Sequence, residues 1–389
     1  MGYSKQGFVD GMTLTHTHLI NMEEGILSAY SGGLEDVYAS NYNVMPGKVD
    51  KTSFNNLLTA GQGKTIRFND GVYEFDFHIV VPSDTSFIGN TKTIFKLTSD
   101  ATSNILFYIV GKTNVTISRI KIDGGLTSQP AGSESDLFDK TGIGTRYGIW
   151  CEKTRRIKLH DIDVCGWDLA GLYCKNNDSG GGSIGRFFHT IELTNSSFYY
   201  NYYGLWYDEY GEYNQTSCCN FGDNYIGVFN CGGNNLYTGC MFCNNYCGFI
   251  LYGSSTKTDP DYIINNSHGG CYCCTYNHNH SSSNSLGGGH AIYVKKCDVG
   301  WNWIGQNIWY GMVTLDNTIG NVFDGTICGN MTFKSFDSSG RKNRNLFVNT
   351  FFHSTSGLNT FKNNNDGSTY LGLYTHPGGV GESEITSAS

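Results

Sequence analysis

Apolar and polar residues alternate in short runs that return along the chain at a nearly constant interval. The phrases NYYGLWYDEY, NYIGVFNCG and NYCGFILYG begin at Asn201, Asn224 and Asn245, which are 23 and 21 residues apart. Each phrase reads Asn, two residues, Gly and an apolar run, which is typical of a stacked structural unit. Aligned on this Gly, or on His290 in its place, seven segments follow one another: 148–152, 171–175, 204–208, 227–231, 248–252, 290–294 and 311–315.

The spacing of these segments predicts the fold. The intervals are 23, 33, 23, 21, 42 and 21 residues, so the base period is about 22 residues with two insertions. A second strand-like run precedes several segments, at residues 156–162, 190–194, 238–242 and 322–327. Two strands and two turns in one period leave no room for a crossover helix. We therefore predict an all-β protein, a right-handed single-stranded parallel β-helix over residues 49–335, with coils about 4.8 Å apart.

Two rows of residues are predicted to stabilise the coils from within. Asparagine recurs at the turn after the second strand and is expected to stack there as an amide ladder, at Asn201, Asn224, Asn245, Asn277 and Asn330. The residue after each aligned position is apolar and is expected to point into the coil. These inward residues are Ile149, Leu172, Leu205, Val228, Phe249, Ala291 and Met312.

The next residue of each segment should point outward, and on four successive coils it is aromatic. An exposed aromatic row is a usual platform for sugar rings. The alternative is that loops or a neighbouring subunit cover this face. The candidate substrate-binding residues are Trp150, Tyr173, Trp206, Phe229 and Tyr252, with His280 and His290 from the segment NHNHSSSNSLGGGH, which is expected to be mobile.

Charged residues recur two positions beyond this row, at Glu152, Lys175 and Asp208. Glycoside hydrolysis needs one protonated acid and one carboxylate, and two coils separate their backbones by about 9.6 Å, which suits an inverting pair. Lys175 would lower the pKa of whichever acid it touches. Glu209 replaces Asp208 if the strand register differs by one residue. The alternative is a surface ion-pair ladder without catalytic function.

Two other functions remain open at this point. A lyase acting by β-elimination on a uronic-acid glycan needs a base and a cation, for which Lys175, Arg155 or Arg156 with Tyr173 or a loop histidine are candidates. No typical calcium cluster of three acids on neighbouring coils appears. The third possibility is a glycan-binding or structural spike domain without activity, because one scaffold hosts many functions.

Composition narrows the possible partners. The 389 residues include 51 Gly and 5 Pro, and the formal net charge of −8 argues against a nucleic-acid partner. No apolar run approaches 18 residues, so no membrane span is expected. The start MGYSKQGFVDGMT lacks the regions of a signal peptide, so we expect a cytoplasmic protein in the producing cell that is released by lysis.

The 14 cysteines are therefore expected to be thiols. A cluster made of Cys240, Cys243, Cys271, Cys273 and Cys274, with His268, His278 and His280 nearby, suggests a zinc site. Cys151 and Cys174, however, fall on inward positions, where cysteine is a suitable small apolar residue. We therefore favour core cysteines and predict no metal and no cofactor.

A resemblance adds to this pattern. The stretch GKTIRFNDGVYEFDFHIVVPSDTSFIGN, residues 63–90, resembles the opening coils of the pectate-lyase-like superfamily, which includes phage tailspike polysaccharide depolymerases. It is preceded by a short helical segment at residues 52–58. The resemblance implies that this region caps and begins a β-helix, and that the protein is a homotrimer acting on a polysaccharide.

The N-terminal stretch GFVDGMTLTHTHLINMEEGILSA is similar to short segments of phage tail and baseplate-associated proteins. That likeness implies an attachment and oligomerisation segment at residues 1–48, located at the virion tail; an ordinary capping helix is the alternative. Residues 336–389 are expected to hold the last coils and a C-terminal tail. The whole pattern predicts a phage tailspike-like protein that binds and hydrolyses a bacterial surface or cell-wall polysaccharide.

Overall fold

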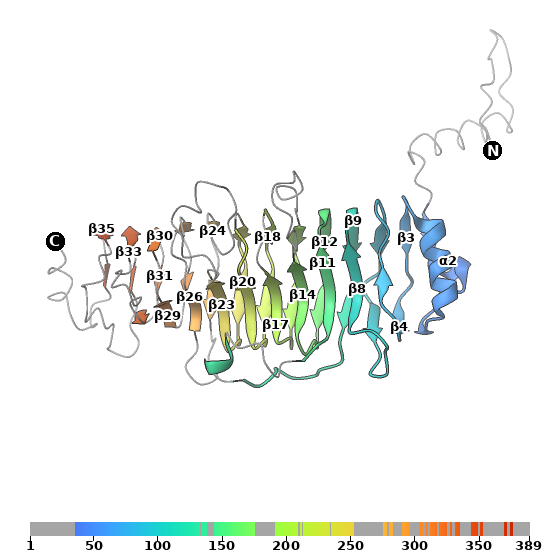
Figure 1. Ribbon diagram of the computed structural model, residues 1–389, viewed down its shortest axis with the longest axis horizontal. Coiled ribbons are helices and arrows are strands. Elements are labelled where there is room, and N and C mark those ends of the chain that lie inside the picture. Colours follow the sequence, from blue (N-terminus) through green and yellow to red (C-terminus); the bar gives the residue numbers. More distant parts are fainter. Residues whose placement is uncertain are drawn as a thin grey trace, which may run out of the picture.

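The computed structural model of the chain is an elongated stack of coils with one helix at an end (Figure 1). It describes residues 36–132, 134–137, 144–175, 191–208, 211, 213–233 and 235–252, and after these only the strands given below. The short helices are η1 (Ala39–Tyr42) and η2 (Glu134–Leu137), and the longer helix is α2 (Lys51–Gly61).

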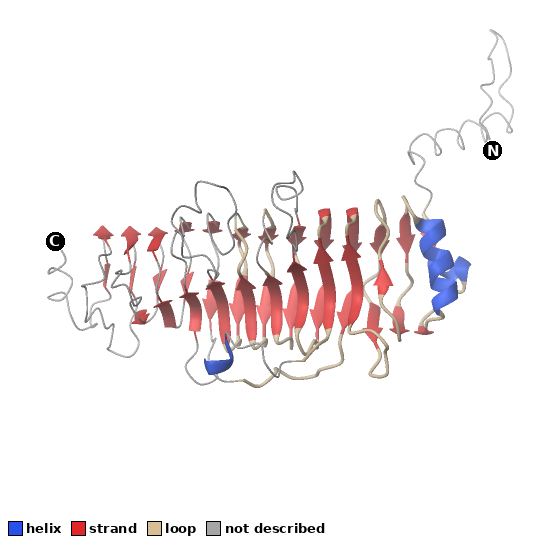
Figure 2. Cartoon of the chain, viewed as in Figure 1, coloured by secondary structure: helices blue, strands red, loops and turns tan. Residues whose placement is uncertain are grey.

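The strands form three parallel sheets, called A, B and C here (Figure 2). Most coils supply one strand to each sheet, whereas among the described strands the first coil and the last two supply sheets A and B alone. Sheet A contains β1 (Val37–Tyr38), β3 (Thr65–Arg67), β6 (Ser86–Ile88), β9 (Thr113–Ser118), β12 (Arg155–His160), β15 (Ile191–Thr194), β18 (Gln215–Ser217), β21 (Leu236–Thr238), β24 (Thr275–Asn277), β27 (Trp303–Gly305), β30 (Ile319–Asp324), β33 (Arg344–Val348) and β35 (Thr369–Leu371).

Sheet B contains β2 (Gly47–Lys48), β4 (Gly71–Phe75), β7 (Thr93–Leu97), β10 (Lys121–Asp123), β13 (Asp163–Cys165), β16 (Ser197–Tyr199), β19 (Asn220–Gly222), β22 (Met241–Cys243), β25 (His280–Ser282), β28 (Ile308–Trp309), β31 (Ile327–Cys328), β34 (Phe351–Phe352) and β36 (Tyr374–Thr375). Sheet C contains β5 (Ile79–Val80), β8 (Ile105–Val110), β11 (Tyr147–Glu152), β14 (Ala170–Lys175), β17 (Tyr203–Tyr207), β20 (Ile226–Asn230), β23 (Cys247–Tyr252), β26 (His290–Lys295), β29 (Met312–Asp316) and β32 (Met331–Lys334).

The predicted fold is confirmed: the chain is a right-handed single-stranded parallel β-helix. The expectation of two strands per coil is wrong, because a single left-handed residue bends the chain between sheet A and sheet B. Asp161 at φ 54° separates β12 from β13, and Gly239 at φ 64° divides residues 238–242 into parts of β21 and β22. One such residue makes a sharp corner that the hydrophobic pattern alone does not reveal.

Helix α2 closes the first coil, as the resemblance implied for residues 52–58. Asp50 caps the helix by accepting a hydrogen bond from the Ser53 backbone N–H at 2.8 Å, which lowers the pKa of the Asp50 carboxyl. Phe54 and Leu57 on its inner face are fully buried. Pairing begins with β1 and β2, ahead of the boundary expected at residue 49. The attachment role of residues 1–48 stays a prediction, and residues 1–35 lie outside the described part.

The recurring glycines permit close stacking of the coils. A Cβ added at Gly148 would lie 2.5 Å from the carbonyl oxygen of Gly171, and one at Gly204 would lie 2.6 Å from that of Gly227. No side chain fits at such distances, so the conserved spacing of this repeat has a steric cause.

The asparagine ladder is confirmed for three coils. The side-chain oxygen of Asn224 accepts from the backbone N–H and side-chain amide of Asn201 at 3.1 and 3.0 Å. Asn245 accepts from Asn224 in the same way, at 3.0 and 3.1 Å. Asn277 does not continue the ladder, because it ends β24 in sheet A opposite Thr238. Asn330 lies outside the described residues.

The predicted register is also wrong by one residue from β26 onward. His290 pairs with Cys247, and Ile292 pairs with Phe249, so Ala291 takes the place of the glycine. Ile292, which takes the register position of Phe249, is fully buried in the core. Met312 pairs with His290 and Val313 with Ile292, across an irregularity, so Val313, rather than Met312, holds the position predicted for the inward residue.

Replacing Asn224 with Ala should destabilise the fold strongly. The substitution removes the acceptor of the Asn201 backbone N–H and side-chain amide, and it removes the side-chain donor to the Phe198 carbonyl and to the amide oxygen of Asn245. We expect the free energy of unfolding to fall by about 3 kcal/mol or more, measured by guanidinium denaturation. The matched control is Asn220→Ala at an exposed position of β19, which should change it by less than about 0.5 kcal/mol. Equal effects of the two substitutions would contradict the ladder.

Candidate functional site

The predicted aromatic row exists on the outer face of sheet C. Trp150, Tyr173, Trp206 and Phe229 occupy one register position on four successive strands. The row extends further towards the N-terminus, since Tyr108 pairs with Trp150 and Val80 pairs with Tyr108. Sequence reasoning missed these two residues because β5 and β8 lack the glycine that marks the later coils. The continuous apolar run ILFYIV, residues 105–110, was the available signal.

The expectation that the row is exposed is wrong for three of its members. Tyr173 is 4% exposed, Trp206 is 5% exposed and Phe229 is 1% exposed. The Tyr173 ring packs edge-on against Trp150 and Trp206, with ring centroids 4.6 Å apart in both pairs. These residues belong to a second apolar cluster outside the coil core, together with Leu137 and others. Trp150 at one end of the cluster and Tyr252 at the other are only partly buried.

A long connection between β10 and β11 helps to form this second cluster. Its described residues 124–132 and 134–137, called the strap here, run along the lower edge of the stack to η2 in Figure 1. The side-chain amide of Gln129 donates hydrogen bonds to the carbonyls of Asn224 and Asn244 at 2.7 and 2.9 Å. Leu137 is fully buried, and the Tyr202 hydroxyl donates to the Asp136 carbonyl at 3.3 Å. The alternative that loops cover this face is therefore confirmed where the strap packs.

The three charged residues align as predicted. Glu152 pairs with Lys175 on the next strand. Asp208 follows β17 directly, and its backbone N–H donates to the Cys174 carbonyl at 2.9 Å, which continues the same register. All three side chains are partly exposed. Among the described residues no ion pair joins Lys175 to either acid, so the interpretation as an ion-pair ladder is not supported there.

Each acid is instead held by an aromatic donor. The indole N–H of Trp150 donates to Glu152 Oε2 at 3.3 Å. The Tyr173 hydroxyl donates to Asp208 Oδ2 at 2.6 Å. Because Tyr173 stands on the coil between the two acids, this bond ties the Asp208 carboxylate to the coil next to Glu152. The two acids thus have fixed orientations beside one partly exposed indole.

Burial and negative charge act together on the neighbouring groups. Burial, followed by the charge of Asp208, raises the pKa of Tyr173 far above its usual value. The same two causes, with a smaller contribution from Asp168, raise the pKa of Tyr147 to about 12. Tyr173 is therefore a neutral hydrogen-bond donor near pH 7 and is unsuited to act as the base of a β-elimination.

The remaining predicted site residues lie elsewhere. His280 begins β25 in sheet B, and His290 begins β26 in sheet C, three strands beyond β17. Within the stretch 277–290, which was expected to be mobile, His280–Ser282 form strand β25. Arg155 and Arg156 begin β12 at the corner between sheets C and A. Glu209 lies outside the described residues.

The cysteines fit the core interpretation. Cys151 and Cys174 pair on adjacent strands and belong to the apolar core, as does Cys240, whereas Cys243 is partly exposed. All cysteines in the described part of the chain are free thiols. Within that part no group of three potential ligands is placed to hold a metal. Cys271, Cys273 and Cys274 of the suggested zinc cluster lie outside it.

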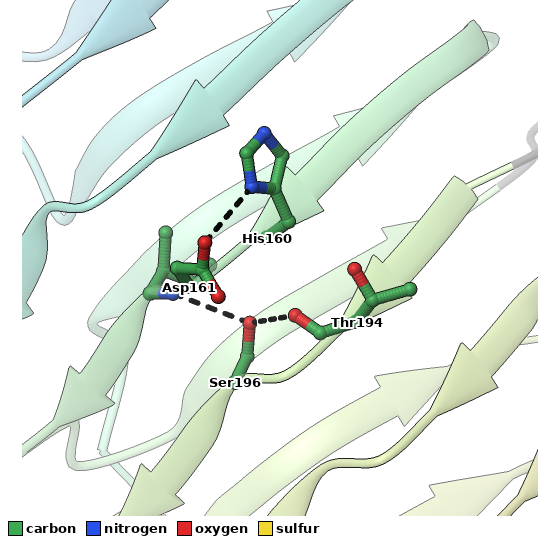
Figure 3. A network of polar contacts seen from close by, with 5 residues as sticks. His160, Asp161, Thr194 and Ser196 are labelled. Atoms are coloured by element: carbon green, nitrogen blue, oxygen red, sulfur yellow. Dashed lines mark hydrogen bonds and ion pairs between the residues drawn. The ribbon is translucent and has the colours of Figure 1, made fainter.

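A second polar network, at the corner between β12 and β13, contains a histidine, an aspartate and a serine (Figure 3). His160 Nδ1 lies 3.3 Å from Asp161 Oδ2. The Ser196 hydroxyl donates to the Thr194 carbonyl at 2.7 Å and accepts from the Ile162 N–H at 3.3 Å. The dashed lines from the Ser196 hydroxyl in Figure 3 lead to these two backbone groups and not to His160, so the network serves the turn rather than nucleophilic catalysis.

Comparison with known proteins supports the fold. No protein-family model and no curated protein sequence matches the chain. The catalytic unit of a thermostable GH87 α-1,3-glucanase from Streptomyces thermodiastaticus is similar with a TM-score of 0.51 and 12% identity, over 89% of this chain and 66% of that one. The Agl-KA catalytic domain is similar with a TM-score of 0.50 and 11% identity, over 88% and 67%.

The ORF18 protein of Geobacillus virus E2 is similar with a TM-score of 0.41 and 16% identity, over 94% of this chain and 65% of that one. The chain thus spans less than two thirds of the length of this protein and of the glucanase unit. Identities this low show a shared architecture, the right-handed parallel β-helix, and nothing finer. In the described part of the chain no helix is long and apolar enough to cross a membrane.

The thiol of Cys174 offers a test of the site's electrostatics. Burial, followed by the charges of Asp208 and Glu152, raises the pKa of this thiol to about 12. A raised pKa keeps the thiol protonated, so alkylation by iodoacetamide at pH 8.5 should leave Cys174 unmodified while it labels the exposed Cys218. Peptide mass spectrometry of the native protein measures both sites. Equal labelling of the two cysteines before unfolding would contradict this arrangement.

Proposed function

We propose that the chain is a phage tailspike-like protein that binds and hydrolyses a bacterial surface or cell-wall polysaccharide. The observation that carries the proposal is the pair Glu152 and Asp208, each oriented by an aromatic donor on the outer face of a parallel β-helix. The partly exposed indole of Trp150 beside Glu152 supplies the apolar surface on which a sugar ring can stack.

The geometry suits an inverting hydrolase. Glu152 and Asp208 lie two strands apart, so their backbones are separated by about 9.6 Å, and the bond from Tyr173 ties Asp208 towards the intervening coil. In such an enzyme one carboxylic acid protonates the glycosidic oxygen, and the other carboxylate takes a proton from the attacking water. The water replaces the leaving sugar at the anomeric carbon from the opposite face.

Sugar binding is assigned to the open end of the aromatic row. Trp150, Tyr108 and Tyr147 are partly exposed and lie on adjacent strands, with the Tyr147 and Trp150 rings 4.8 Å apart. Tyr173 and Trp206 take a supporting role in this proposal, because their faces are covered by neighbouring rings. Tyr252 stands at the far end of the same face and is a second candidate contact.

The proposal of a phage-tail role rests on resemblance to other proteins. The glucanase shows that this architecture can carry polysaccharide hydrolysis in another protein. The resemblance of residues 63–90 to tailspike depolymerases and of the N-terminal stretch to phage tail proteins supports a homotrimer attached to a virion tail or baseplate. Localisation at the virion and release by lysis are parts of the same proposal.

The test is polysaccharide degradation by the full chain and two variants. Purified protein is incubated with bacterial capsular and cell-wall glycans, and new reducing ends and chain length are measured. Glu152→Gln and Asp208→Asn should each reduce the initial rate by about 10²-fold or more, because each removes one of the two carboxyl groups. Glu192→Gln, an exposed acid on β15, is the matched control and should keep full activity.

Other products would overturn the hydrolase. Ultraviolet absorbance from a new C=C bond, unaffected by either variant, would indicate a lyase that uses Lys175 or Arg155 as the cation. Binding without shortening of any glycan would instead make the face a recognition surface of a non-catalytic spike domain.

A further inference from the structure

The corner between sheets C and A carries positive charge next to the proposed site. Lys112 and Lys153 follow strands β8 and β11 and lie on neighbouring coils, offset by one position, because the Gly111 N–H donates to the Glu152 carbonyl at 2.9 Å and the Arg155 N–H donates to the Lys112 carbonyl at 3.0 Å. Lys153 is exposed, and Lys112 is partly exposed. Arg156, also exposed, lies on the sheet A side of the same corner. We call Lys112, Lys153 and Arg156 the basic corner.

The charge of the basic corner is not neutralised by the described acids. Among the described residues no ion pair includes any of its three members. Glu152, which precedes Lys153 in the chain, accepts a hydrogen bond from Trp150, and Asp84 accepts one from the amide of Asn114 at 2.6 Å. A cationic corner on a chain of net charge −8 is therefore a local feature and not a consequence of overall composition.

The backbone of the basic corner has the left-handed conformation that also occurs at other corners of the coils. Lys153 has φ 52°, and the equivalent position on the preceding coil is Gly111 with φ 64°. Arg156 has φ 54°, opposite Asn114 with the same φ of 54°. Glycine and asparagine adopt this conformation readily, whereas lysine and arginine do so at a conformational cost. Lys153 and Arg156 thus form the turn, as Arg119 and Cys218 do at other corners, and their exposed side chains carry the positive charge.

The distance between the basic corner and the aromatic row determines which part of a bound sugar the basic corner would contact. Tyr108 precedes Lys112 by four residues, and Trp150 precedes Lys153 by three, on paired strands. Strand rise of about 3.3 Å per residue places the corner roughly 10–13 Å along the strands from the stacked rings, which is within reach of long side chains. A sugar on Tyr108 or Trp150 would therefore direct a substituent towards the ammonium groups.

We infer that the glycan bound at this face is anionic and that its carboxylate or phosphate groups lie against Lys112 and Lys153. This inference rests on the proposed function, because it names the class of polysaccharide for the same site. Ammonium groups pair with either anion as point charges, so the charge, rather than one particular acid group, is recognised.

The test measures binding of the full chain to three probes by affinity electrophoresis: dextran as the neutral glycan, polygalacturonate for carboxylate and wall teichoic acid for phosphate. We expect retardation by at least one anionic probe and none by dextran. The double variant Lys112→Gln/Lys153→Gln should bind that probe about fivefold more weakly at low salt and lose most of the salt dependence. The charge-matched control Lys92→Gln/Lys96→Gln, at β7 in sheet B rather than at the corner between sheets C and A, should bind as the parent does.

The outcomes separate this inference from the function on which it rests. Tighter binding of dextran than of both anionic probes would overturn the inference while leaving a polysaccharide-binding protein. Anionic binding that is equal in the two double variants would overturn the role of the basic corner. No retardation and no cleavage of any glycan would overturn the proposed function and the inference with it. Circular dichroism of both double variants establishes that each is folded.

Discussion

Stacking of like residues at the spacing of one β-ladder is the constraint on which this structure depends. Each strand residue has a counterpart on the neighbouring coil, so a polar group buried in the stack can be satisfied by that coil. Asn201, Asn224 and Asn245 meet this requirement through amide hydrogen bonds of 3.0 and 3.1 Å. The recurring glycines are required by the same stacking, because a carbonyl oxygen of the next coil lies too close for a Cβ at these positions.

The same register that orders the core also orders the outer face. Because Glu152, Lys175 and Asp208 stand at one position on three coils, a pair of acids arises two ladder steps apart without any special loop. The aromatic residues beside them form a ladder for the same reason. Within the described residues, their hydroxyl and indole groups donate the hydrogen bonds that orient the acids. The aromatic row therefore has two roles in this proposal: it orients the carboxylates, and it offers a surface for a sugar ring.

The type of side chain at this face therefore changes along each strand and from coil to coil. Aromatic rings lie in the middle of the strands, the acids lie two residues further, and the basic corner follows at the turn into sheet A. Towards the C-terminal coils the strap and its neighbours bury the rings, whereas Tyr108 and Trp150 keep part of their surface open. Such a gradient favours a ligand that combines an apolar ring face with an acidic substituent.

The hydrophobic period and the recurring Asn and Gly were sufficient to predict the parallel β-helix, the amide ladder and the alignment of Glu152 with Lys175, because these depend on residues one coil apart.

Three features were decided only by the tertiary structure. The third strand of each coil depends on single left-handed residues such as Asp161, which the hydrophobic pattern does not mark. The one-residue shift at His290 depends on how an inserted coil meets its neighbour. The burial of Trp206 and Phe229 depends on a cluster that includes Leu137, in a strap whose Gln129 bonds to Asn224, 95 residues away. A local repeat shows which way a side chain points, but not which distant segment lies over it.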